Sequence, residues 1–174
     1  TEAPAMSASP SATVKTKSSV ISWSTDRSAN SFVKYGTKSG DYGDEVGSSE
    51  QVAYHEITLT NLTPGTNYYY KVLWTDEDGN TGSSSELSFV TDPAPFISAV
   101  KVKNTSITST YLSFVVKNAS KVTVQYGKTS NYGGIKTIST AKSETEHTIL
   151  LDDLLEGTLY HYRIVAEDEE EKVI

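Results

Sequence analysis

The chain repeats itself once, with a period the size of a domain. Five separate segments of the first half return in the second half at an offset of about 91 residues. They are residues 20–23 with 111–114, 32–36 with 123–127, 41–43 with 131–133, 55–59 with 147–151, and 62–70 with 154–162. Solenoid repeats are much shorter, at roughly 20–50 residues, so each copy is expected to form a domain. We predict one domain over residues 1–92 and a second over residues 93–174, joined by a short, stiff linker that contains Pro93 and Pro95.

Both copies alternate apolar and polar residues at period two, which is typical of antiparallel strands with one buried face. Turn-forming residues separate these runs, for example at 26–30, 39–41 and 78–80. The residues expected to face the two cores are Ile21, Trp23, Val33, Tyr35, Ile57, Leu59, Leu62, Tyr68, Tyr70, Val72, Leu87 and Phe89 in the first copy, and Leu112, Phe114, Val124, Tyr126, Ile149, Leu151, Leu154, Tyr160, Tyr162 and Ile164 in the second. The sequence therefore predicts an all-β fold of two tandem β-sandwiches.

Composition excludes several classes of function. The 174 residues include no cysteine, which excludes a disulfide framework, a thiolate metal site and a cysteine nucleophile. The net charge of −7 argues against a protein that binds a nucleic-acid backbone. No run approaches the roughly 18 apolar residues of a membrane-spanning helix. We therefore expect no nucleic-acid partner and no membrane span.

Two motifs carry a resemblance to a known family. The second predicted strand of each copy holds a large aromatic residue, Trp23 or Phe114. A Leu-x-Pro-Gly-Thr-x-Tyr-x-Tyr run then ends at Tyr68 and Tyr70 in the first copy. In the second copy, Glu156 replaces the proline of this run. With these motifs, each copy resembles a fibronectin type III domain, and the resemblance covers nearly the whole chain.

The resemblance implies a structural role for the aromatic residues. The tyrosine run looks like the tyrosine corner of the family, in which the first tyrosine hydroxyl bonds to the backbone of the preceding connection. The residues expected to have structural roles are Trp23, Tyr68, Tyr70, Phe114, Tyr160 and Tyr162. The first copy is especially similar to the subgroup found in tandem in bacterial surface proteins and at the N-terminus of purple acid phosphatases. This subgroup implies a bacterial protein that is extracellular or at the cell surface.

The sequence offers no catalytic, cofactor-binding or metal-binding constellation. His55 and His147 are repeat equivalents and are therefore expected to be structural, while His161 is expected to point outward. Residues 76–80 resemble half of a calcium loop but are better explained as a hairpin turn. The acidic residues 167–171 occupy the same place in the second copy and are expected to form a solvated loop, with weak cation binding as the alternative.

The two copies differ at their ends. The first closes with an alternating strand over residues 86–91, and at the same offset its counterpart would lie just after Ile174. The second copy is therefore expected to lack its last strand, either because the chain is a piece of a longer array or because another chain supplies that strand by edge addition. Residues 1–4 are similar to residues 91–95, so Thr1 is expected to end a strand of a preceding copy.

The leading prediction is a non-catalytic spacer, adhesion or interaction module of a longer surface or secreted protein. One alternative is an accessory part of a secreted hydrolase, such as a phosphatase or glycoside hydrolase, and another is a strand-exchanging fibre subunit. The partner would be a protein or carbohydrate at the cell surface, or further domains of the same chain. Tyr54, Tyr69 and Leu73 are the candidates for a solvent-facing strip that contacts carbohydrate.

Overall fold

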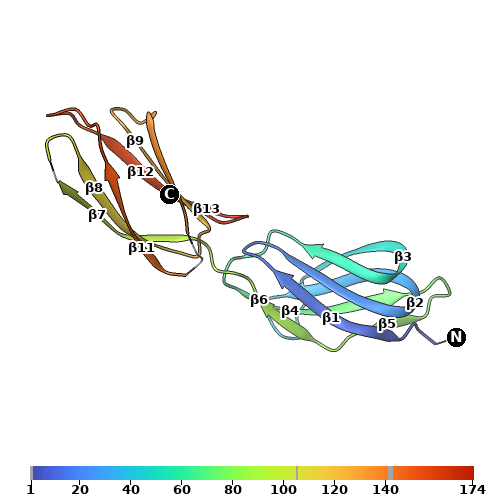
Figure 1. Ribbon diagram of the computed structural model, residues 1–174. Helices are drawn as coiled ribbons and strands as arrows, with labels where there is room; N and C mark the ends of the chain where they lie inside the picture. The colour runs from blue at the N-terminus through green and yellow to red at the C-terminus, as the bar shows by residue number, and fades with distance from the viewer. Residues whose placement is uncertain (1, 105, 141–142) are drawn as a thin grey trace. The chain divides into compact units, whose positions relative to one another are not determined.

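The computed structural model describes residues 2–104, 106–140 and 143–174, so Thr1 lies outside the described residues. The chain forms two compact units, Thr1–Pro93 and Ala94–Ile174, which we call the first and second units. This division lies one residue beyond the boundary expected from the repeat. Within the described ranges both units consist of strands and connections, with no helix (Figure 1).

The first unit contains six strands. They are β1 (Met6–Val14), β2 (Ser19–Gly36), β3 (Asp44–Leu59), β4 (Asn67–Thr75), β5 (Thr81–Ser83) and β6 (Leu87–Val90). The N-terminal half of β2 pairs with β1 and with the end of β3, and its C-terminal half pairs with β4 and with the start of β3. The strands β2 and β3 therefore belong to both layers of the sandwich. Both β5 and β6 pair with β4 on the edge away from β2.

The prediction of a loop at residues 26–30 is wrong, because these residues lie within β2. Pairing with β3 is regular from Ser19 to Ser24 and resumes at Ser31, and the register shifts between these stretches. Ala29 is fully buried in this irregular stretch. A bulged strand absorbs the extra residues and bends the chain from one layer to the other without breaking the hairpin.

The core of the first unit holds the residues that the alternation predicted. Tyr35 and Leu87 are only half-buried. The other ten predicted residues are buried: Ile21, Trp23, Val33, Ile57, Leu59, Leu62, Tyr68, Tyr70, Val72 and Phe89. Trp74 is buried as well, and its indole N–H donates to the carbonyl of Pro4 at 2.8 Å.

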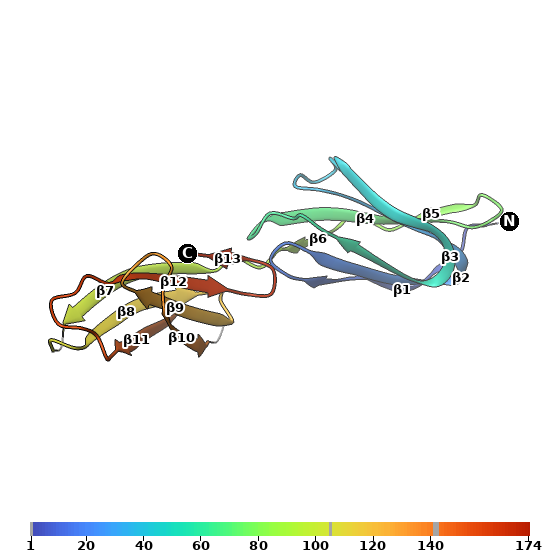
Figure 2. The ribbon, with the colours of Figure 1, turned by 90° about the horizontal axis from the view of Figure 1, so that it is seen from above.

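The second unit contains seven strands in two sheets. They are β7 (Phe96–Asn104), β8 (Thr110–Lys117), β9 (Lys121–Gly127), β10 (Gly134–Ser139), β11 (Thr145–Leu151), β12 (His161–Glu167) and β13 (Lys172–Val173). One sheet has the order β11-β8-β7, and the other has the order β10-β9-β12-β13 (Figure 2). Here the path that β2 follows in the first unit is divided between β8 and β9, with Asn118 at a φ of 59° between them.

Among the described residues of the second unit, no strand corresponds to β6, whose counterpart the repeat places just after Ile174. Its β13 pairs with Ala166 and Glu167 and corresponds to β5. No further strand pairs with β12 on that edge in the described part of the unit. The predicted core is correct for the buried residues Leu112, Phe114, Val124, Ile149, Leu151 and Ile164. It is wrong for Tyr162, which is 40 % exposed, and Tyr126, Leu154 and Tyr160 are only half-buried.

Candidate functional site

The most enclosed titratable group of the first unit is His55. It lies opposite Trp23 in the β2–β3 ladder, and the two rings stack with centroids 4.7 Å apart. The Thr25 hydroxyl donates to the carbonyl of Arg27 at 2.7 Å, so His55 Nε2–H must donate to Thr25 Oγ1 at 2.8 Å. His55 Nδ1 then accepts from the Ser31 hydroxyl at 2.7 Å. Burial lowers the pKa of His55, and the arrangement holds a neutral imidazole in a fixed orientation.

The equivalent histidine of the second unit has different surroundings. His147 lies opposite Phe114, with ring centroids 5.6 Å apart and planes tilted by 37°. At the repeat offset, Thr25 and Ser31 correspond to Val116 and Val122, so both hydroxyl partners are replaced by valine. His147 Nε2 is buried without a hydrogen-bond partner among the described atoms. The His147 side chain as a whole is half-buried, so only this one ring nitrogen is enclosed.

Each unit has a hydrogen bond at its tyrosine corner. The N–H of Thr63 donates to the Tyr68 hydroxyl at 3.0 Å, and the N–H of Leu155 donates to the Tyr160 hydroxyl at 3.0 Å. The first bond is partly buried, whereas the second is exposed. The glycine before each corner has a positive φ, 60° at Gly65 and 61° at Gly157, so the turn keeps its shape although Glu156 replaces the proline.

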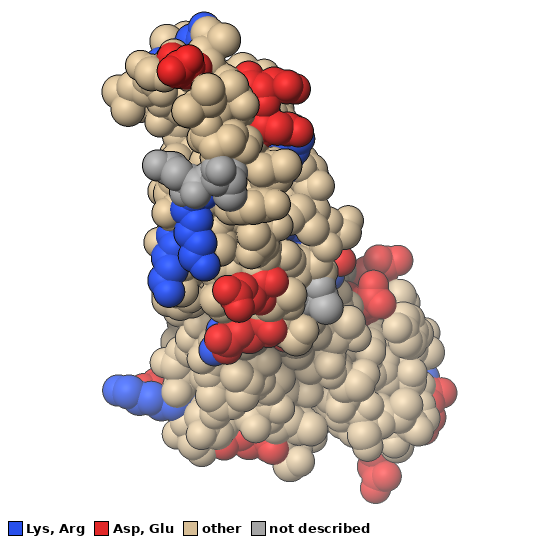
Figure 3. Space-filling view, turned by 60° about the vertical axis from the view of Figure 1, so that its left-hand side comes forward, with Lys and Arg blue, Asp and Glu red and all other residues tan. Residues whose placement is uncertain are grey.

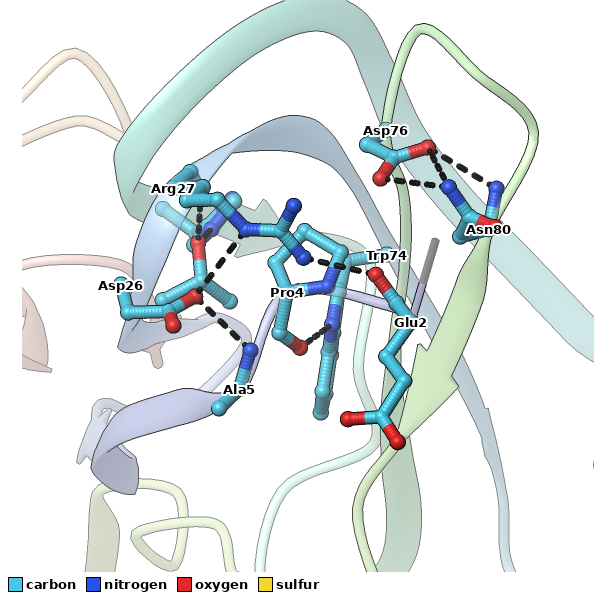
Figure 4. A network of polar contacts seen from close by, with 10 residues as sticks. Glu2, Pro4, Ala5, Asp26, Arg27, Trp74, Asp76 and Asn80 are labelled. Atoms are coloured by element: carbon cyan, nitrogen blue, oxygen red, sulfur yellow. Dashed lines mark hydrogen bonds and ion pairs between the residues drawn. The ribbon is translucent and has the colours of Figure 1, made fainter.

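The loop at residues 76–80 is a closed turn (Figure 4). Asp76 Oδ1 accepts hydrogen bonds from the N–H groups of Asp78 and Asn80 at 3.1 and 2.8 Å. The side-chain amide of Asn80 donates to both carboxylate oxygens of Asp76, which lowers the pKa of Asp76. Gly79 has a φ of 86°, a conformation that glycine adopts without strain. The carboxylate is therefore used to form the hairpin turn that joins β4 to β5.

The acidic residues 167–171 form the corresponding turn between β12 and β13. Asp168 Oδ1 accepts from the N–H groups of Glu170 and Glu171 at 2.8 and 2.6 Å. Glu167 pairs with Lys121 at 2.6 Å, and this hydrogen bond lowers the pKa of Glu167. The described residues include no cluster of three or more His, Asp or Glu side chains that could hold a metal ion.

The three candidates for a carbohydrate-binding strip do not lie together. Tyr54 is 60 % exposed and lies opposite Ser24, in the layer formed with β1. Tyr69 and Leu73 are half-buried and lie on β4, in the other layer. Charged side chains of both signs lie on the surface in view (Figure 3). His161 is exposed on β12, as expected.

A groove lies in the second unit. It has a volume of about 510 Å³ and lies between the two sheets, next to the unpaired edge of β12. The exposed apolar residues that line it are Val102, Ile107, Leu155, Leu159 and Tyr162. Leu155 and Leu159 occupy the positions of Thr63 and Asn67 in the first copy, and this exchange of polar for apolar residues is the sequence signal that could have located the groove.

Comparisons with known proteins agree with this architecture. Residues 7–91 match the family model of the purple acid phosphatase N-terminal domain. The crystal structure of the FN1–FN3 domains of chicken CNTN1 is similar to this chain, with 14 % sequence identity and a TM-score of 0.50. The matched region covers 98 % of this chain and 62 % of the chicken CNTN1 chain. The fold is that of tandem fibronectin type III domains.

Curated relatives are similar over much of the chain. The receptor-type tyrosine-protein phosphatase eta of Gallus gallus is 26 % identical over 113 residues, which is 64 % of this chain and 8 % of the relative. Neogenin of Rattus norvegicus is 28 % identical over 142 residues, which is 75 % of this chain and 10 % of the relative. The chain thus spans a tenth or less of the length of these relatives. In the part of the chain that the structure describes, no helix is long and apolar enough to cross a membrane.

Proposed function

We propose that these tandem domains are a non-catalytic spacer and interaction module of a longer extracellular or cell-surface protein. The observation that carries the proposal is the repeat itself: two fibronectin type III units, each with its own core, follow one another along the chain. Units that bury separate cores can bear load or present binding surfaces without depending on each other's folding.

The state of the polar residues supports a structural role. His55, which is fully buried, uses both ring nitrogens in hydrogen bonds to Thr25 and Ser31. Asp76 and Asp168 use their carboxylates to hold hairpin turns. These groups stabilise local geometry, and none of them is aimed into the groove. The similarity to a relative named as a receptor-type phosphatase supports a surface location. The partner that we propose is a protein or carbohydrate at the cell surface.

Force spectroscopy on the intact chain tests the spacer role. Pulling from the two ends should give two separate unfolding events, one for each unit. The Phe89→Ala variant, which removes a core ring of the first unit, should lower the force of one event and leave the other unchanged. A single event, or extension without any force peak, would contradict the proposal.

A second candidate function is supported by the family-model match. The match over residues 7–91 favours an accessory domain attached to a secreted phosphatase. Under this alternative the chain would bind or orient a separate catalytic domain and would itself be inactive on phosphoesters. An assay of the purified chain with a chromogenic phosphomonoester and divalent metal ions should give no turnover above background. Turnover that a His55→Ala variant abolishes would overturn the non-catalytic assignment for both candidates.

A further inference from the structure

The irregular stretch of β2 at residues 25–31, which we call the bulge, holds the chain that leads into β1 (Figure 4). The N–H of Asp26 donates to the carbonyl of Ala5 at 2.9 Å, and the N–H of Ala5 donates to Asp26 Oδ1 at 2.8 Å. The Arg27 guanidinium donates to the carbonyl of Glu2 at 2.7 Å. Backbone and side-chain bonds from two consecutive residues of the bulge therefore fix residues 2–5 on the first unit.

Trp74 holds the same segment from β4. Its indole N–H donates to the carbonyl of Pro4 at 2.8 Å, and the side chain is only 4 % exposed. The ring packs against the backbone of Gly82, where an added Cβ would lie 2.4 Å from ring atoms. Because the ring is held so closely, the indole N–H presents one fixed donor to the segment, and its exchange with water reports whether Pro4 is in place.

His55 supports the bulge from inside the sandwich. The Thr25 hydroxyl accepts from His55 Nε2 at 2.8 Å and donates to the carbonyl of Arg27 at 2.7 Å. The Ser31 hydroxyl, at the other end of the bulge, donates to His55 Nδ1 at 2.7 Å. Regular pairing of β2 with β3 is interrupted between Ser24 and Ser31. The imidazole therefore ties the two ends of the bulge together where the backbone ladder does not.

This arrangement suits a neutral imidazole and not a charged one. His55 is fully buried, and burial lowers its pKa. A proton on Nδ1 would remove the acceptor that the Ser31 hydroxyl uses, and the charge would be placed where water does not reach. Hydration of the charge requires an opening in the wall around the ring. The bulge is the part of that wall with the fewest ladder bonds, so it should open first.

Neighbouring charges do not compensate a proton on His55. Among the described residues, the hydrogen bonds of His55 go to Thr25 and Ser31, which are both neutral. The strands β1, β5 and β6 contain no acidic or basic residue. The titratable side chains of the adjoining parts of β2, β3 and β4 are Asp26, Arg27, Glu50, Tyr54, Glu56, Tyr70 and Asp76. The Asp26 and Arg27 side chains lie 3.8 Å apart and are about half exposed, and Asp76 is bonded to Asn80.

We propose that residues 2–5 and the bulge form an acid-sensitive latch, in which a proton on His55 opens the bulge and releases residues 2–5 while the core of the first unit stays folded. The strand β1 should remain in place, because its regular pairing with β2 runs from Ser11 to Val14, away from the bulge. The chain that enters the first unit would thus be fixed at neutral pH and free in acid. A buried histidine that biases a local opening is an established form of pH switch.

A pH titration of the intact chain by NMR tests the latch. The measurement follows the His55 ring, the Trp74 indole N–H, and the protection factors of the Ala5 and Asp26 amides. We expect the protection factors to fall by at least about tenfold as His55 takes up its proton, whereas that of the buried core amide of Val72 is retained. The titration is repeated in an Asp26→Asn variant, which keeps an oxygen acceptor for the Ala5 N–H but cannot titrate, and the same fall is expected there.

Two further variants separate the latch from general acid unfolding. In His55→Gln the side-chain amide can donate to Thr25 and accept from Ser31 but does not titrate, so protection at Ala5 should stay constant over the same pH range. Thr25→Val removes the link to the carbonyl of Arg27 and should release Ala5 already at neutral pH, with Val72 still protected. Protonation of His55 without loss of protection at Ala5 would overturn the proposal. Loss of Ala5 protection only together with that of Val72, or an equal loss in His55→Gln, would overturn it as well.

Discussion

The two units have the same strand plan but complete it to different degrees. In the first, β6 covers the edge of β4, and the ring of Phe89 seals the core against Tyr68 and Tyr70. In the second, no strand among the described residues pairs with the equivalent residues 159–162, and Tyr162 is 40 % exposed. The two histidine sites also differ in their hydrogen bonds. His55 bonds to two hydroxyl groups, whereas His147 Nε2 has no partner among the described atoms. A repeated sequence therefore keeps its apolar pattern more faithfully than its polar contacts.

Removal of the sealing ring should make the first unit resemble the second. The Phe89→Ala variant deletes a buried ring, and such changes cost about 3–5 kcal/mol of unfolding free energy. Both tryptophans, Trp23 and Trp74, lie in the first unit, so tryptophan fluorescence during urea denaturation reports this unit alone. The control Val90→Ala alters a residue of the same strand that is 58 % exposed and should have little effect. A loss below 1 kcal/mol for Phe89→Ala would show that the ring does not seal the core.

Converting the histidine pocket of the first unit to that of the second should cost less. The Thr25→Val variant removes the hydroxyl that bonds to His55 Nε2 and so leaves a buried ring nitrogen unpaired. An unsatisfied buried polar group costs about 1–3 kcal/mol. Urea denaturation followed by tryptophan fluorescence measures the loss, and Thr58→Val, at an exposed position of β3, is the matched control. Equal midpoints for the two variants would mean that the His55 hydrogen bonds contribute nothing to stability.

The two tyrosine corners should differ in strength. Tyr68→Phe removes the acceptor of a partly buried N–H, that of Thr63, and is expected to cost about 1 kcal/mol. Tyr160→Phe removes the acceptor of the exposed N–H of Leu155, which water can replace, so its cost should be smaller. Tryptophan fluorescence measures the unfolding of the first unit in the Tyr68→Phe variant. The NMR signals of backbone amides in the second unit measure its unfolding in the Tyr160→Phe variant. A larger loss for Tyr160→Phe would reverse the comparison.

Acid should weaken the first unit through His55. Burial lowers the pKa of His55 in the folded unit, whereas the unfolded chain takes up a proton near the ordinary value of about 6.5. The stabilisation is therefore complete above pH 6.5 and is lost as the pH falls below that value. The urea midpoint measured by tryptophan fluorescence should decrease as the pH is lowered from about 6.5 to 5. The control His161→Gln should show the same dependence of the midpoint on pH, because His161 is exposed. A midpoint that rises over this range would contradict the assignment.

The sequence predicted the architecture because apolar alternation and the repeat survive in both copies. It located the aromatic cores at Trp23 and Phe114, which are both 1 % exposed. It failed at residues 26–30, because turn-forming residues can also be accommodated in a bulged strand when both flanks pair with β3. It also placed Tyr162 in the core, because alternation shows which face a residue takes but not whether a neighbouring strand covers it.

Local sequence also could not reveal the difference between the histidines. His55 and His147 are repeat equivalents, and their surroundings are set by residues that lie far from them along the chain. Only the pairing of β2 with β3 brings Thr25 and Ser31 to His55. The substitutions to Val116 and Val122 become informative once the two copies are aligned residue by residue.

Hydrogen exchange at the two equivalent edges tests the central claim most directly. The measurement compares the backbone amides of residues 67–70 with those of residues 159–162 in the intact chain. The amides of residues 67–70, beside β6, should exchange slowly, whereas their equivalents in the second unit should exchange rapidly. Similar slow exchange at both sets of amides would contradict the difference between the two units.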